Sequence, residues 1–177
     1  MRRTGTLILL AVALSASVPR AARQEMIQIE RTFDSRVQSL NPDDPFSVMR
    51  PTLGLYLENY GAVFTAEVNL LAAQFPMPFG HEYTREQRAR FREKKLQRIA
   101  TLKETMQQTL MDAAGILSSL PPEQSVVFGV SIFRWKWEDT AGLPSQIIMQ
   151  APRRALLQAK AGRAEALKGA LKVEQIE

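Results

Sequence analysis

The chain has 177 residues, a formal net charge of +5 at neutral pH and no cysteine. The missing cysteines exclude disulfide bonds, thiol catalysis and metal sites with sulfur ligands, so the fold must be stabilised by core burial alone. A chain of this length forms one domain with a sizeable core.

The first 17 residues have the features of a signal peptide. Two arginines precede the uncharged segment 6–18, which is shorter than the roughly 20 residues of a membrane-spanning helix. A cut after Ser17 has small residues at positions −3 and −1, whereas a cut after Ala22 would place Arg20 at −3. We predict export to the periplasm or the medium, with an uncleaved N-terminal anchor as the alternative. Cleavage removes both arginines and leaves a net charge of +3.

Residues 24–177 predict a single domain that starts with a helix over 24–40. Apolar residues at steps of three and four indicate this helix: Met26, Ile29, Phe33, Val37 and Leu40. A turn with two prolines follows at 41–45. Residues 53–71 predict a hairpin with Gly61 at its turn. Leu53, Leu55 and Leu57 alternate with other residues, as the apolar face of a half-buried strand does.

A long helix is predicted over 84–120. Thr84 and Gln87 have the spacing of a capping box at its start, and two prolines end it after Leu120. One apolar stripe follows it, formed by Ile99, Leu102, Met106, Leu110, Ala113, Leu117 and Leu120. We expect this stripe to lie on a sheet. Its near-heptad spacing would also suit a coiled-coil helix pair, and hence a homodimer.

The strongest strand pattern is at 124–137, where apolar residues occupy both faces as in a central strand. A turn at 138–144 and a return strand at 146–150 complete a second hairpin. Pro152 suits the first turn of a helix over 153–160. Residues 164–171 continue as a helix, and 172–176 form a short strand or a frayed tail.

These elements predict an α+β domain. Helices alternate with hairpins, so we expect an antiparallel sheet of two hairpins with a long central helix and flanking N- and C-terminal helices. Charge is uneven along the chain: 25–67 has seven acidic and three basic residues, and 85–98 has seven basic and two acidic residues. These segments either face each other in the fold or form two poles on the surface.

No catalytic motif stands out. His81 is the only histidine, and the chain has neither a nucleophile elbow nor a glycine-rich phosphate loop. The candidates for a catalytic site are Glu67, His81 and Asp139. Glu67 lies in an apolar strand, where burial would require a basic partner and the alternative is a solvent-facing position. We expect no metal and no cofactor.

Two sets of side chains are candidates for ligand binding. Trp135 and Trp137 share a strand face with Phe133 and would form a flat platform for a glycan or peptide, or else pack in the core. The other set has helical spacing and forms a positive ridge: Arg85, Arg88, Arg92 and Lys95. Export argues against nucleic acid, so the ridge would bind anionic lipid headgroups, acidic glycans or a protein, or would simply be solvated.

The segments YLENYGAVFTAEVNL (56–70) and WEDTAGLPSQIIMQAPRRALL (137–157), with the basic long helix between them, resemble a group of uncharacterised exported bacterial proteins. The resemblance implies export and a single domain, and it carries over no activity and no site residues. We therefore predict an exported, non-enzymatic protein that acts through protein–protein contacts. The alternatives are a cell-envelope glycan-binding module or a hydrolase.

Overall fold

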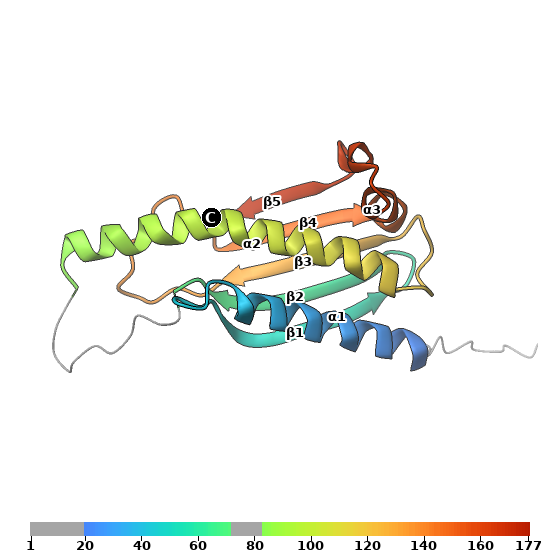
Figure 1. Ribbon diagram of the computed structural model, residues 1–177. Helices are drawn as coiled ribbons and strands as arrows, with labels where there is room; N and C mark the ends of the chain where they lie inside the picture. The colour runs from blue at the N-terminus through green and yellow to red at the C-terminus, as the bar shows by residue number, and fades with distance from the viewer. Residues whose placement is uncertain (1–19, 72–82) are drawn as a thin grey trace, which may run out of the picture.

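The computed structural model describes residues 20–71 and 83–177, which form an α+β fold (Figure 1). The predicted signal peptide and His81 lie outside these residues. In chain order the elements are α1 (Arg20–Ser39), β1 (Ser47–Leu57), β2 (Gly61–Asn69), α2 (Arg85–Ile116), β3 (Ser125–Ile132), β4 (Gln146–Pro152), α3 (Arg153–Lys160), the 3₁₀ helix η1 (Ala164–Leu167) and β5 (Lys172–Ile176).

The five strands form one sheet in the order β1-β2-β3-β4-β5. Both predicted hairpins are present, but the prediction of a purely antiparallel sheet is wrong, because β2 and β3 are parallel. The reason is α2, which returns the chain along the full length of the sheet. Ser125 at the start of β3 therefore pairs with Gly61 at the start of β2. A connection of this kind joins parallel strands.

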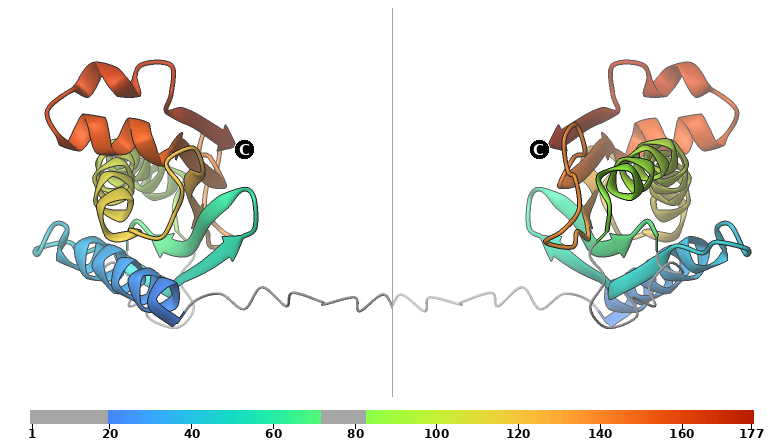
Figure 2. Two further views of the ribbon diagram at one scale, coloured as in Figure 1. Left: turned by 90° about the vertical axis from the view of Figure 1, so that its right-hand side faces the viewer. Right: turned by 90° about the vertical axis from the view of Figure 1, so that its left-hand side faces the viewer.

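The helices lie on one side of the sheet, as both views of Figure 2 show. The core between the two layers includes an aromatic group in which the ring of Phe128 lies 4.7 Å from that of Phe33 and 5.1 Å from that of Phe64. The whole predicted stripe of α2, from Ile99 to Leu120, is buried in this core. A stripe covered by the chain's own sheet does not also form a coiled coil with a second chain.

Several element ends differ from the predictions. The capping box of α2 is confirmed, because the Gln87 N–H donates to Thr84 Oγ1 at 3.2 Å and the Thr84 N–H to Gln87 Oε1 at 2.9 Å. The helix ends at Ile116, before the predicted Leu120, one residue after the weak helix former Gly115. Of the helix predicted at 164–171 only the short η1 forms, and 172–176 is the strand β5.

Ion pairs join the helices to each other and to the turn after α1. The Asp112 carboxylate of α2 accepts hydrogen bonds from Arg36 at 2.5 Å and from Lys160 of α3 at 2.7 Å. Burial alone would raise the pKa of Asp112, but these two cations outweigh it and hold the pKa below its usual value. Asp44 pairs with Lys94 and Arg98, so the acidic and basic segments face each other at this point.

Candidate functional site

Three leucines of β1 point away from the helices. Leu53, Leu55 and Leu57 are 52%, 54% and 46% exposed, so the expectation that they form the buried face of this strand is wrong. Thr52 and Gly54 are the buried residues of this part of β1. In the return strand β2, the residues buried against the helices are Ala62, Phe64, Ala66 and Val68.

Gly54 and two carboxylates of α1 determine which face of β1 is buried. A Cβ atom at position 54 would lie 2.7 Å from Cε1 of Phe64, so the strand approaches the core closely only because this residue is glycine. The Thr52 N–H donates to Asp34 at 3.1 Å, and the Gly54 N–H donates to Glu30 at 2.9 Å. These contacts fix β1 against α1, and the strand's alternation then turns the leucines outward.

The register of the sheet extends this apolar row over the neighbouring strands. Leu55 pairs with Val63 of β2, which pairs with Val127 of β3. A second row of paired residues on the same face starts at Leu53 and reaches Ile148 of β4. We call the exposed Leu53, Leu55 and Leu57, with the partly exposed Val63 beside them, the leucine patch, whereas Val127 in the row of Leu55 is buried. Within residues 20–71 and 83–177, all three α-helices lie on the other side of the sheet.

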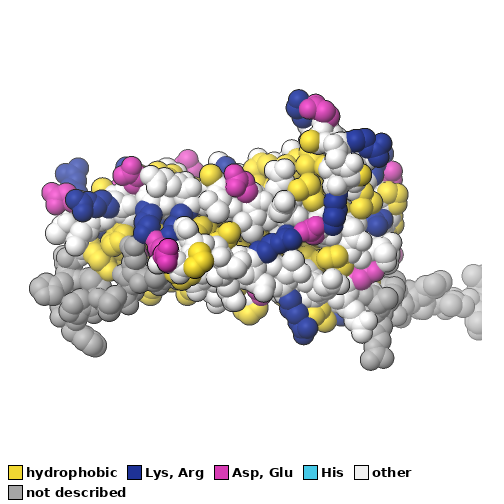
Figure 3. All heavy atoms as spheres, in the orientation of Figure 1, with side chains coloured by type: hydrophobic (Ala, Val, Ile, Leu, Met, Phe, Trp, Pro, Cys, Tyr) yellow, Lys and Arg dark blue, Asp and Glu magenta, His cyan; other side chains and the backbone are white. Residues whose placement is uncertain are grey.

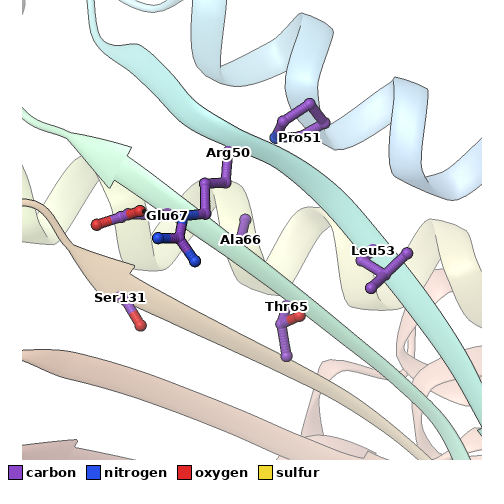
Figure 4. A pocket seen from close by; sticks show the side chains of 7 residues that line it. All are labelled: Arg50, Pro51, Leu53, Thr65, Ala66, Glu67 and Ser131. Atoms are coloured by element: carbon purple, nitrogen blue, oxygen red, sulfur yellow. Dashed lines mark ion pairs between the residues drawn. The ribbon is translucent and has the colours of Figure 1, made fainter.

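A depression of about 390 Å³ adjoins the leucine patch at Leu53 (Figure 4). Its lining consists of Arg50, Pro51, Leu53, Thr65, Ala66, Glu67 and Ser131. Glu67 forms an ion pair with Arg50 at 3.1 Å, with its side chain 28% exposed. The sequence left open whether Glu67 is buried with a basic partner or faces solvent, and the residue is partly buried beside an arginine.

The lining of the depression carries few ionisable side chains. It contains one carboxylate, Glu67, held by a cation, and two hydroxyls, those of Thr65 and Ser131. Among the described residues, the lining contains no histidine and no second carboxylate.

The catalytic candidates do not form one cluster in the structure. Glu67 lies on the open face of the sheet with Arg50, whereas Asp139 pairs at 3.4 Å with Arg92 of α2, on the helix side. His81 is outside the described residues. In the part of the chain that the structure describes, no group of three His, Asp or Glu side chains is placed to hold a metal ion.

Two of the four side chains of the predicted positive ridge of α2 form ion pairs within the chain, Arg92 with Asp139 and Lys95 with Glu138. Arg88 donates through Nε to the Tyr83 carbonyl at 3.1 Å, and Arg85 is exposed. Figure 3 shows basic side chains among acidic ones on this side of the molecule. The segment after β3 packs against the side of α2 that carries Arg92 and Lys95.

Lys95, the fourth ridge residue, is buried. Its Nζ lies 2.5 Å from Glu138, with 1% and 3% of the two side chains exposed, and it also donates to the Phe133 carbonyl at 3.1 Å. Burial lowers the pKa of Lys95, and the hydrogen bond to Glu138 only partly offsets this. A pair so fully covered has no access for a ligand, so it anchors the segment after β3 to α2.

The predicted tryptophan platform is absent because β3 ends at Ile132 rather than at 137. The Phe133 carbonyl bonds to Lys95 instead of continuing the strand ladder. Trp137 packs against Tyr83, with ring centroids 4.1 Å apart, and Trp135 stands edge-on to Phe133 at 5.0 Å. Trp135 and Trp137 thus lie after the end of β3, beyond the strand on which they were predicted to share a face.

No protein-family model matches the chain, and neither the curated proteins nor the solved structures gave a match. None of the helices in the described residues is long and apolar enough to cross a membrane.

The residues of this site that the sequence did not indicate are Arg50, Ser131 and the outward leucines. Gly54 was a signal in the sequence that could have indicated the outward leucines, because a glycine within a strand often marks a close approach of the backbone to its neighbours.

Proposed function

We propose that this protein is non-enzymatic and binds another protein through the leucine patch and the depression beside it. The observation that carries the proposal is the row of Leu53, Leu55 and Leu57, each about half exposed on the sheet face that none of the described helices covers. Contiguous exposed apolar residues beside polar ones are typical of binding surfaces. An apolar centre with a polar rim, here Arg50 and Glu67, is the usual arrangement of a protein interface.

The other functions considered from the sequence have less support. A glycan-binding platform on a strand face would need Trp135 and Trp137 within β3, and the strand ends at Ile132. A hydrolase would need Glu67 and Asp139 in one site, and each pairs with its own arginine on a different side of the sheet. Attraction to an anionic surface would need a free basic ridge along α2, but Arg92 and Lys95 are paired with Asp139 and Glu138.

Photocrosslinking in the producing cells tests the proposal. A benzophenone amino acid at position 55 is expected to give one discrete adduct with a protein, and the same partner should be recovered from position 53. The matched control is position 96 on α2, because Leu96 is also exposed, at 41%, but lies outside the patch. Adducts of equal yield at positions 55 and 96, or none at 53 and 55, would contradict the proposal.

We also propose that the protein acts outside the cytoplasm after a cut following Ser17. This cut leaves α1 whole, since the helix begins at Arg20, whereas a cut after Ala22 would remove three residues of α1, including the buried Ala22. N-terminal sequencing of the protein exported by a Gram-negative host is expected to begin at Val18. A full-length chain retained in the membrane fraction would contradict cleavage, and a cytoplasmic chain would contradict export.

A further inference from the structure

The two edges of the sheet are protected unequally. At β1 the outward N–H groups of Thr52 and Gly54 donate to Asp34 and Glu30 of α1, and Arg23 donates to the Gly54 carbonyl at 3.4 Å. At the other edge, β5 is the last strand of the sheet and all five of its residues are exposed (Figure 1). An uncovered edge is a template for a further strand.

The ladder determines which backbone groups of β5 point outward. The Arg153 N–H donates to the Gln124 carbonyl and the Ile132 N–H to the Ser145 carbonyl, so odd-numbered residues of β4 bond to β3. Even-numbered residues of β4 therefore bond to β5, where their partners are also even-numbered. The N–H and C=O groups of Val173 and Gln175 consequently point away from the sheet.

These outward groups allow three registers near the middle of the strand when β5 pairs antiparallel with a second β5, and two of them place charged side chains of the two copies opposite each other. The third, with Gln175 opposite its own counterpart, places Glu174 opposite Ile176 and gains no ion pair. Pairing Val173 with Gln175 of the second copy would place the two Glu174 side chains opposite each other, and like charges in this position are destabilising. Pairing Val173 with its own counterpart places Lys172 opposite Glu174 of the second copy, and does so twice. These pairs do not share hydrogen bonds, so their side chains approach most closely.

We propose that two copies of the chain associate through β5 in this second register and form a continuous ten-stranded sheet. Lys172 and Glu174 are both exposed, and neither forms an ion pair with another described residue. Val173, 44% exposed, meets its counterpart on the helix side of the sheet. The leucine patch lies toward the opposite edge, at β1, and both copies of it stay free, so this proposal is independent of partner binding.

Charge reversal tests the register on the purified protein by sedimentation equilibrium. Glu174→Lys and Lys172→Glu each place like charges opposite one another, and each is expected to weaken the dimer by roughly tenfold or more. The double variant Lys172→Glu/Glu174→Lys restores opposite charges and should return close to the wild-type dissociation constant. Both residues are exposed, so the variants should keep the wild-type melting temperature.

Two further variants separate this proposal from partner binding and from general effects of charge. Leu55→Glu should leave the dimer intact while it disrupts the leucine patch, and Arg163→Glu, an exposed change outside β5, should leave the dimer intact as well. A chain that is monomeric at every attainable concentration would overturn the proposal. So would a dimer that both single charge reversals leave unchanged, or one that only Leu55→Glu disrupts.

Discussion

At Gly54 the absence of a side chain determines how closely β1 approaches the core. Any Cβ atom there would overlap with the ring of Phe64, at 2.7 Å, and with the end of Met26, at 2.8 Å. Met26 is flexible and can move, but the Phe64 ring is held against Phe128 in the core. A substitution at Gly54 therefore acts on the strand that carries the exposed leucines.

We expect Gly54→Ala to lower the free energy of unfolding by about 1–3 kcal/mol, the usual cost of inserting a methyl group into a packed core. The matched control is Gly129→Ala in β3, where a Cβ atom would lie 3.7 Å from its nearest neighbour. Urea unfolding of both variants measures the difference. Equal losses at the two positions would show that the close approach of β1 does not matter.

Periodicity alone predicted the buried stripes of α1 and α2, because one face of each helix is clearly more apolar than the other. It failed for β1, where hydrophobicity favours Leu53, Leu55 and Leu57 as the inner face. The contacts that reverse this choice come from Glu30 and Asp34, some 20 residues earlier in the chain. Such long-range hydrogen bonds leave no local pattern in the strand itself.

At the scale of elements, the buried pair of Lys95 and Glu138 connects α2 to the segment after β3. Local sequence placed Lys95 on a solvated ridge, since helical spacing shows which residues share a face and not what covers it. The start of α2 was predictable because a capping box is a local signal. Its C-terminal end and that of β3 were not, since tertiary contacts such as the Lys95 bond to Phe133 influence where they lie.

Breaking this pair should cost more than breaking an exposed one. Lys95→Met leaves the Glu138 carboxylate buried without a partner, and we expect a loss of about 3–5 kcal/mol of unfolding free energy. Replacing both residues, as in Lys95→Met/Glu138→Leu, should recover most of this loss. The neighbouring variant Lys94→Met, which removes a partly exposed pair with Asp44, should cost about 1 kcal/mol or less.

Chemical unfolding of the wild type, Lys95→Met, Glu138→Leu and the double variant forms a double-mutant cycle, and Lys94→Met is the control outside it. The cycle should give a large coupling energy for Lys95 and Glu138. A loss for Lys95→Met no larger than that for Lys94→Met would contradict the account, because it would mean that the Glu138 carboxylate reaches water without rearrangement of the segment after β3.

For the whole molecule, element types and order were largely predictable, and the topology was not. Two hairpins and a long helix followed from the sequence, but the parallel pairing of β2 with β3 depends on the direction in which α2 crosses the sheet. The candidate site was predictable only at Glu67. Arg50 and Ser131 join it through strand register, which brings together residues 81 positions apart.

The central claim is that the leucine patch binds a protein, and the affinity of the partner recovered by crosslinking tests it most directly. We would titrate the purified partner against the wild-type chain, Leu55→Glu and the matched surface variant Leu96→Glu, each checked for a wild-type melting temperature. A charged residue at the apolar centre of an interface should weaken binding by roughly tenfold or more. The account predicts this loss for Leu55→Glu and near wild-type affinity for Leu96→Glu; equal affinities for all three proteins would contradict it.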